Sequence, residues 1–279
     1  RRWLLPTSWA VDKVDKARRK TLNIVVCIKQ VPDTAAEKKL NADLRLERTG
    51  IENIPNPFDE YAIEEALKVK EAKGGTVTAL CMGPETAKEA LRKAIAMGVE
   101  KAVLVTDPKL TGSDAWATAY TLSQALKKLE FDLVLFGMQS TDSATGLVAS
   151  GVAEFLGLPQ HTYTIKLEVG DGQVTSQRQT ETGYDVVSSP TPAVVAVVKG
   201  INEPRYPSLK GIMNAKRTVI TNWSLSDIGV DGSEVGTGGP KEKVLSFSPR
   251  EPRKGGQVIQ DEGDSGAKIT EFLTFKKVL

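Results

Sequence analysis

The feature that most constrains the fold is the regular alternation of short apolar runs with amphipathic stretches between residues 23 and 156. Continuous apolar runs rich in β-branched residues are typical of strands that are buried on both faces of a sheet. Strands that alternate with helices form βαβ units with right-handed connections and a parallel sheet. The chain is therefore expected to fold as an α/β domain. We predict strands at 23–31, 76–82, 101–106 and 131–137, and helices at 59–73, 84–97, 113–129 and 145–156.

The pattern changes after residue 160. Four strand-like segments follow, HTYTIKLEV, QVTSQRQT, YDVVSS and AVVAVV, and the GDG sequence at 170–172 is a strong hairpin signal. We interpret these segments as antiparallel additions to the same domain. From Gly229 to about Gly266 the chain has nine glycines and no apolar periodicity, so this segment cannot bury a core of its own. Because the chain then ends in ITEFLTFKKVL, we expect an extended arm that becomes ordered on a partner.

These patterns divide the chain into a basic extension outside the fold at 1–21, an α/β domain at 22–228 and the arm at 229–279. Residues 1–20 carry seven basic and two acidic side chains, whereas the rest of the chain carries 30 basic and 33 acidic ones. The net charge of −3 on the body disfavours a nucleic-acid partner. The extension fits neither a secretory signal nor a transit peptide well. No apolar run approaches the roughly 18–20 residues of a membrane span, so an integral membrane protein is not expected.

The cysteine and histidine content argues against disulfides and metal centres. Cys27 and Cys81 lie inside apolar runs and are predicted to be buried strand residues. This favours a reducing compartment, the cytoplasm or, in a eukaryote, the mitochondrial matrix. The single histidine, His161, is expected at the start of a strand. Without a cysteine or histidine cluster there is no evident ligand set for zinc, haem or an iron–sulfur centre, and we predict no metal site.

Ligands of open parallel sheets bind beyond the carboxyl ends of the strands, near the switch in strand order. In the loop at 56–60, Asn56 is suited to cap a helix, Pro57 to be its first residue and Asp59 to complete a capping box. The loop GMQSTDSATG is the strongest phosphate candidate, because the helix after it offers free N–H groups. Four loops are expected at this edge: 27–33, 56–60, 81–85 and 137–146.

Several polar residues remain open to two interpretations at this stage. Asp33, Asp59 and Asp142 could converge for acid–base chemistry, although capping and solvated loop ends are the favoured interpretation. Arg205 could face an anionic cofactor or pair with an acidic neighbour. Leu209, in the proline-flanked stretch RYPSLKGIMNAK, is predicted to lie on a loop and to face water. The hydroxyl-rich loop could bind a phosphate or simply cap the next helix through Ser140, Thr141, Asp142, Ser143 and Thr145.

Six motifs in register carry a resemblance to a known family: VVCIKQVPDT, NPFDEYAIEEAL, CMGPETAKEALRKAIAMG, DLVLFGMQSTD, AEFLGLPQ and INEPRYPSLKGIMNAK. Through them residues 23–279 resemble the β (small) subunit of electron-transfer flavoproteins. The resemblance implies a Rossmann-like three-layer domain of the adenine-nucleotide-binding (alpha hydrolase-like) type, with a mostly parallel sheet. It also implies a heterodimer with a larger α subunit, around which the arm wraps. The redox-active FAD would lie mainly on that α subunit, against the β subunit.

In function, the resemblance implies an electron carrier rather than an enzyme. Such a subunit accepts electrons from dehydrogenases, for example the acyl-CoA dehydrogenases of fatty-acid β-oxidation, and passes them to a quinone-linked oxidoreductase. It normally buries an AMP. The alternative is the β subunit of an electron-bifurcating complex, in which a second FAD replaces AMP and NADH is oxidised there. The cofactor-binding residues that the resemblance implies are Cys27, Asn56, Pro57, Phe58, Asp59, Met82, Gly137, Gln139, Ser140, Thr141, Asp142, Ser143, Thr145, Gly146, Leu147 and Val148.

The chain departs from the family pattern at the head of the phosphate-site helix. Many members have Asn, Gln and Thr where this chain has Gly146, Leu147 and Val148, so backbone N–H groups and Thr145 would have to hold the AMP phosphate. Bifurcating relatives typically have Asp-Gly-Asp-Thr-Ala-Gln-Val in this stretch, of which the chain keeps Asp142, Thr145 and Val148. We favour AMP over a second FAD.

The same resemblance gives the exposed leucine a function. In the family, the segment that matches RYPSLKGIMNAK is a recognition loop whose leucine inserts into an apolar pocket on the partner dehydrogenase. The implied docking residues are therefore Leu209 with Pro207, Ile212 and Met213. The alternative is that Leu209 folds back onto the body of the domain.

Overall fold

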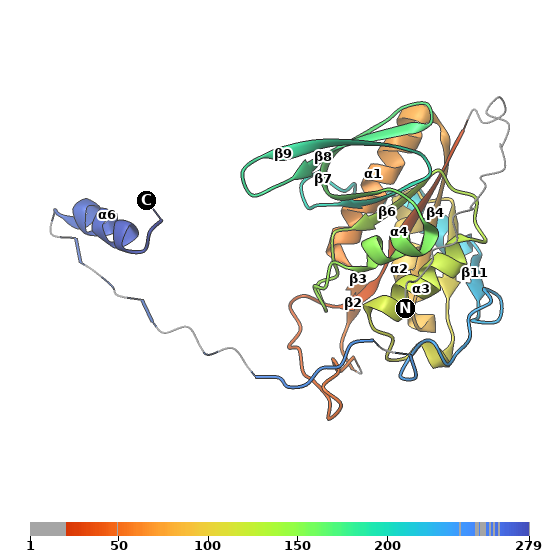
Figure 1. Ribbon diagram of the computed structural model, residues 1–279, viewed down its shortest axis with the longest axis horizontal. Coiled ribbons are helices and arrows are strands. Elements are labelled where there is room, and N and C mark those ends of the chain that lie inside the picture. The colour runs from red at the N-terminus through yellow and green to blue at the C-terminus, as the bar shows by residue number, and fades with distance from the viewer. Residues whose placement is uncertain are drawn as a thin grey trace, which may run out of the picture. The chain divides into compact units, whose positions relative to one another are not determined.

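The computed structural model describes residues 21–48, 50–239 and 241–248, and then 251, 255–256, 258, 260–261 and 263–278 (Figure 1). Nine strands of the described chain form one sheet in the order β11-β5-β4-β1-β6-β10-β7-β8-β9. The parallel strands are β1 (Leu22–Ile28), β4 (Gly75–Met82), β5 (Lys101–Val105), β6 (Leu133–Gly137), β7 (Gln160–Val169), β10 (Ala193–Val197) and β11 (Ile220–Trp223). β8 (Gln173–Gln179) and β9 (Tyr184–Pro190) continue the sheet in antiparallel pairing. The predicted fold class, a mostly parallel α/β sheet with antiparallel additions, is confirmed.

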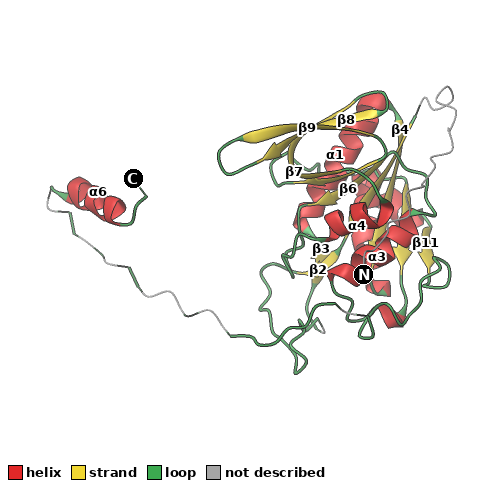
Figure 2. Cartoon of the chain, viewed as in Figure 1, coloured by secondary structure: helices red, strands yellow, loops and turns green. Residues whose placement is uncertain are grey.

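Helices cover both faces of the parallel part of the sheet, which gives three layers (Figure 2). α1 (Pro57–Lys73) and α2 (Lys88–Met97) pack on the face that receives Ile24 and Val26 of β1. α3 (Ala115–Leu126) and α4 (Val148–Leu156) pack on the opposite face with Val25 and Cys27. Successive side chains of a strand point to opposite faces, so one apolar run supplies both cores. Cys27 and Cys81 are buried and unbridged, as predicted.

Two predicted elements have different boundaries in the structure. The strand predicted at 23–31 divides, because β1 ends at Ile28 and β2 (Gln30–Pro32) pairs instead with β3 (Asn53–Pro55). The side chain of Asp59 accepts a hydrogen bond from the backbone N–H of Lys29, at the break between β1 and β2. The helix predicted from residue 145 begins only at Val148, after Gly146 adopts a positive φ of 64°.

The remaining predictions of secondary structure agree more closely. The GDG turn joins β7 to β8, and His161 lies at the start of β7. A short 3-10 turn, η1 (Glu85–Ala87), precedes α2, and a second one, η2 (Pro108–Leu110), precedes α3. None of the helices among the described residues is long and apolar enough to cross a membrane. The predicted extension at 1–21 lies outside the described residues except for Thr21.

The chain divides into two compact units, Arg1–Lys243 and Val244–Leu279. The second unit contains α6 (Ser265–Phe275), on which Ile269, Phe272 and Phe275 are exposed. The start of the segment predicted as an arm differs from this division, because Val230 and Val235 are buried in the same core cluster as α3. Two isolated valines among glycines give no periodic signal, which is why the sequence placed the boundary earlier, at residue 229.

Candidate functional site

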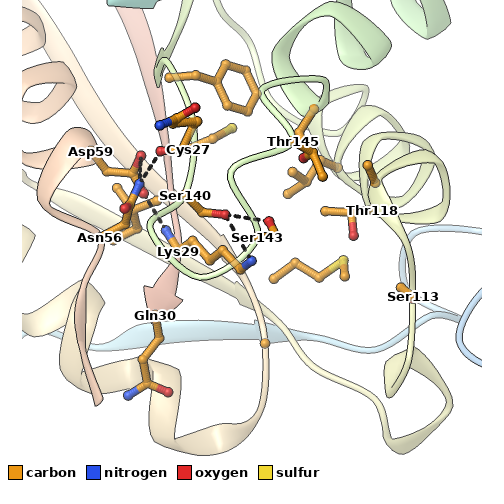
Figure 3. Close-up of a pocket in the computed structure, with 18 of the residues that line it drawn as sticks. Cys27, Lys29, Gln30, Asn56, Asp59, Ser113, Thr118, Ser140, Ser143 and Thr145 are labelled. Carbon is orange, nitrogen blue, oxygen red and sulfur yellow. Dashed lines mark hydrogen bonds between the residues drawn. The ribbon is translucent and has the colours of Figure 1, made fainter. Parts of the chain in front are cut away.

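A cavity of about 630 Å³ opens at the carboxyl ends of β1, β4 and β6 (Figure 3). The chain runs from β1 outward to β4 and β5, and then returns to place β6 on the other side of β1. This reversal is the switch in strand order at which open α/β sheets bind ligands. The volume lies within the usual range for small-molecule sites. All four loops expected at this edge line the cavity, including the loop at 81–85 through Met82 and Gly83.

A buried polar group forms the floor of the cavity at the start of α1. The Asn56 side chain donates to Asp59 Oδ1 (2.9 Å) and to the carbonyl oxygen of Gln139 (2.9 Å), and its Oδ1 accepts from the backbone N–H of Thr141 (3.2 Å). Asn56 occupies the N-cap position, with Pro57 next, but its side chain does not cap α1. The predicted capping box is therefore wrong. Both side chains instead bridge α1 to the loops after β1 and β6.

Asp59 is fully enclosed by this arrangement. Burial raises the pKa of its carboxyl group to about 7, although hydrogen bonds from Asn56 and from the backbone N–H of Lys29 act in the opposite direction. A Cβ atom added to Gly137 would lie 2.5 Å from Asp59 Oδ1 and 2.6 Å from the carbonyl carbon of Phe58. The end of β6 therefore approaches α1 as closely as glycine allows. Since protein donors already satisfy its oxygens, Asp59 holds the floor together.

Two cations close the loop that follows β6. Lys29 Nζ donates to Asp142 Oδ1 (2.8 Å) and to Ser140 Oγ (3.3 Å), and Arg48 pairs with the other oxygen of Asp142. Burial of Asp142 opposes ionisation, but the charge and hydrogen bonds of Lys29 and Arg48 hold the pKa of its carboxyl group well below the usual range. Asp142 is thus ionised and paired, which disfavours acid–base work. Asp33 does not line the cavity with Asp59. Its carboxylate instead accepts a hydrogen bond from the backbone N–H of Ala35.

The head of α4 faces the same cavity. The first N–H groups of any α-helix have no partner within the helix, and Leu147 at the N-cap position provides no side-chain cap. Thr145, Gly146, Val148 and Ala149 line the cavity at this end. A helix N-terminus without a cap, preceded by a glycine, offers N–H donors and a positive dipole end to an anion.

The cavity brings together most but not all of the predicted cofactor residues. Pro57 and Phe58, at the start of α1, are absent from the lining, and so is Leu147, which is 55% exposed. Thr141 and Asp142 belong to the adjoining loop but are also absent from it. Those that line the cavity are Cys27, Asn56, Asp59, Met82, Gly137, Gln139, Ser140, Ser143, Thr145, Gly146 and Val148.

Sequence reasoning missed a further set of lining residues. Lys29 lies in the predicted loop at 27–33 and is a cation directly after a buried strand, which could have identified it as a site residue. Arg48 comes from an irregular stretch without periodicity, and Glu242 from the segment assigned to the arm. The loop between β5 and α3 was not considered, although Asp114 before an apolar stripe is an N-cap signal. The main additions are Lys29, Arg48, Ser113, Asp114, Thr118 and Glu242.

A strap formed by residues 236–239 and 241–242 crosses the start of α3 beside the cavity. Asp114 Oδ1 caps α3 by accepting from the backbone N–H of Ala117 (2.8 Å), while Oδ2 accepts from the backbone N–H groups of Lys241 and Glu242 (3.0 Å for Glu242). The backbone N–H of Gly236 donates to Ser113 Oγ (2.9 Å). One carboxylate therefore fixes both the helix and the strap.

Asp114→Ala is expected to lower the free energy of unfolding by about 1–2 kcal/mol, the range for a lost N-cap, and to release the strap. Hydrogen exchange followed by mass spectrometry should show faster exchange at Lys241 and Glu242. Asp227→Ala is the matched control, because Asp227 accepts from the backbone N–H of Ser224 (2.7 Å) in a surface turn. Unchanged exchange of the strap in Asp114→Ala would contradict its anchoring by this residue.

The predicted docking residues lie elsewhere: Leu209, Ile212 and Met213 are on α5 (Leu209–Arg217), and Pro207 lies just before it. Leu209 is 80% exposed, as expected, but it is the first residue of a helix capped by Ser208 Oγ, which accepts from the backbone N–H of Gly211 (3.0 Å). The predicted loop is therefore wrong from residue 209 onward. Ile212 and Met213 are also exposed, whereas Pro207 is half-buried.

The structure also gives the contacts of Arg205 and His161. Arg205 pairs with Glu64 and Glu71 of α1, which decides for the acidic neighbours. His161 is buried between the hydroxyl groups of Ser176 (2.7 Å) and Ser189 (2.8 Å), and burial lowers the pKa of its ring. Among the described residues no group of three metal-ligating side chains occurs.

Comparison with known proteins assigns the chain to a family. A family model described as "Electron transfer flavoprotein domain" matches residues 43–228. The electron transfer flavoprotein subunit beta of Mycobacterium leprae is 43% identical over 264 residues, which cover 92% of this chain and 99% of that protein. The chain belongs to the electron-transfer flavoprotein β-subunit family. The β subunit of Megasphaera elsdenii is 40% identical over 265 residues, covering 92% of this chain and 98% of that protein.

Another relative in this family has a different name. The caffeyl-CoA reductase-Etf complex subunit CarD of Acetobacterium woodii is 40% identical over 238 residues, which cover 84% of this chain and 90% of that protein. The β-subunit family is one of electron carriers, and membership implies an α-subunit partner. The resemblance noted in the sequence is thus confirmed at the level of the family.

Proposed function

We propose that this chain is the β subunit of an electron carrier, that it binds AMP in the cavity at the carboxyl ends of β1, β4 and β6, and that it docks dehydrogenases through α5. The observation that carries the proposal is the convergence at one cavity of the β6–α4 loop, the uncapped head of α4 and the buried floor of α1. FAD, when bound by the α subunit, supplies the redox chemistry.

The residues around the cavity fit an adenine nucleotide. Apolar and thiol side chains at the strand ends, Cys27, Met82 and Phe136, suit a flat heteroaromatic base. At the other end the backbone N–H groups of α4 and the hydroxyl group of Thr145 suit a phosphate. The small Gly146 leaves room for close approach to the backbone. These donors take the place of the Asn, Gln and Thr side chains common at this position.

The second candidate is the β subunit of a bifurcating complex that oxidises NADH at a second FAD. The relative from the caffeyl-CoA reductase-Etf complex favours it. So do Lys29 and Arg48, since two cations beside the cavity could accompany more than one phosphate. We place AMP first because the second Asp and the Gln of the bifurcating pattern are replaced by Ala144 and Leu147.

Docking of the electron donor is assigned to α5. An acyl-CoA-type dehydrogenase is the proposed donor and a quinone-linked oxidoreductase the acceptor. Leu209 and Tyr206, which is three residues earlier and 95% exposed, present apolar surface without cover from the described part of the first unit. One or two apolar anchors in a polar surround suit a small, transient interface.

Leu209→Ala is expected to weaken docking of the donor by about 1–3 kcal/mol, as for an interface hot spot, with unchanged FAD content of the αβ complex. The measurement is the rate of flavin reduction by a purified acyl-CoA dehydrogenase as its concentration is varied. Val186→Ala is the control, since Val186 is 65% exposed on β9. Equal rates for the Leu209 and Val186 variants would remove α5 from the docking surface.

A further inference from the structure

Arg205, which lies shortly before α5, is bound by two carboxylates of α1. Its Nε donates to Glu64 Oε2 (2.7 Å) and its Nη2 to Glu64 Oε1 (2.9 Å), so one carboxylate is held by two parallel bonds. Nη1 and Nη2 reach the two oxygens of Glu71, and the backbone N–H of Arg205 donates to Glu64 Oε2 (3.1 Å). Glu64 is only 6% exposed, whereas Glu71 is largely exposed. Two turns of α1 thus hold a single arginine.

The segment that Arg205 fixes leads directly into the docking surface. Tyr206 follows at once, and Leu209 begins α5 three residues further on. On the upstream side the Asn202 side chain donates to the carbonyl oxygen of Tyr61 (3.0 Å) and to Glu65 (2.9 Å) of α1. The segment that precedes α5 is therefore attached to α1 at two positions, Asn202 and Arg205.

α5 itself is seated on α2. A Cβ atom added to Gly211 would lie 2.0 Å from the carbonyl oxygen of Ala96, so the backbones of the two helices meet there. Arg92 of α2 donates to the carbonyl oxygen of Ala215 (2.7 Å), and Ala215 is buried. α2 fixes α5 from Gly211 onward, whereas Tyr206 and Leu209 come before this contact and follow directly from the segment that Arg205 holds.

We propose that Arg205 is a positioning residue, which holds Tyr206 and the start of α5 at Leu209 in the orientation needed to dock the electron donor. This inference rests on the docking role proposed above for Leu209. Binding through an exposed apolar side chain costs less when that side chain is already ordered. The planar guanidinium matches both carboxylates in a fixed geometry that an ammonium group does not reproduce.

The test uses the purified αβ complex and measures flavin reduction by an acyl-CoA dehydrogenase over a range of dehydrogenase concentrations. Arg205→Gln is expected to raise the KM for the dehydrogenase about tenfold, and Arg205→Lys about threefold, the scale of one side chain that must be ordered on binding. The kcat should remain unchanged, because the proposed role of Arg205 is confined to docking of the dehydrogenase. Arg178→Gln, at an exposed position of β8, is the matched control and should leave KM unchanged.

Two additional variants keep the proposal testable if Arg205→Gln folds poorly around the buried Glu64. Glu71→Gln removes one exposed partner of Arg205 without leaving a buried charge, and should raise KM about twofold at an unchanged unfolding temperature. The Leu209→Ala variant distinguishes a failure of the positioning role of Arg205 from a failure of docking through α5. An increase of KM in Leu209→Ala without one in Arg205→Lys and Glu71→Gln would overturn the positioning role alone. Unchanged KM in Leu209→Ala would overturn docking through α5 and this inference with it.

Discussion

Gly137→Ala is expected to abolish nucleotide retention and to lower the free energy of unfolding by about 3 kcal/mol, the upper part of the usual range for overpacking. The added Cβ atom would lie 2.5 Å from Asp59 Oδ1 and 2.6 Å from the backbone of Phe58. Neither neighbour can easily withdraw, because Asp59 is bound by Asn56 and by the backbone of Lys29. The floor of the cavity would have to open.

The measurement is chemical unfolding of the variant, together with the nucleotide released from the purified αβ complex. Gly183→Ala is the control, because a Cβ atom at Gly183 would meet nothing within 4 Å. If Gly137→Ala kept its nucleotide and the stability of the control, β6 and α1 would not form the rigid floor described here.

The buried carboxyl group of Asp59 is expected to make the protein less stable as pH rises from about 4 to 7. Burial raises the pKa of Asp59 from 3.8 to about 7, so in this interval the folded protein holds a proton that the unfolded chain has released. The stabilisation is complete below the unfolded value and is lost as pH rises through the folded one. We expect this group to lower the free energy of unfolding by up to about 4 kcal/mol over the interval.

Urea unfolding of the wild type and of Asp59→Asn at several pH values between 5 and 8 isolates this effect. The difference between the two proteins removes the contribution of His161, whose pKa is lowered by burial. That contribution has the opposite sign, since it is present above the unfolded pKa and is lost as pH falls. The same difference removes the contribution of Asp142, whose lowered pKa gives a stabilisation that is complete above the unfolded value of 3.8 and is lost only as pH falls below it. Parallel stability curves for the two proteins would show that Asp59 does not titrate in this range.

Periodicity is the reason that the fold could be predicted from the sequence. Buried parallel strands need apolar side chains on both faces, as in Ile24 to Ile28, and the helices need one apolar stripe, so both leave strong local patterns. Right-handed crossovers then decide which face of the sheet each connecting helix covers. It was this topology, rather than any single motif, that placed Cys27, Asn56 and Gly137 at one edge of the sheet.

The parts that were not predicted depend on contacts between residues far apart in the chain. Arg48 pairs with Asp142, and Asp114 binds the backbone of Glu242, but neither stretch carries a repeating pattern. Asn56 has the sequence of a helix cap, yet its side chain serves the loop after β6. α5 was assigned to a loop because Pro207 and Gly211 are turn residues, whereas Gly211 is required where α5 meets α2.

The central claim is that the cavity binds AMP in a subunit that carries electrons through the flavin of its α partner. The most direct test is to purify this chain with its α subunit and to quantify the nucleotides that denaturation releases. The proposal predicts one FAD and one AMP per heterodimer, and no oxidation of NADH by the complex. Two FAD molecules per heterodimer, together with NADH oxidation, would contradict it and establish the bifurcating alternative.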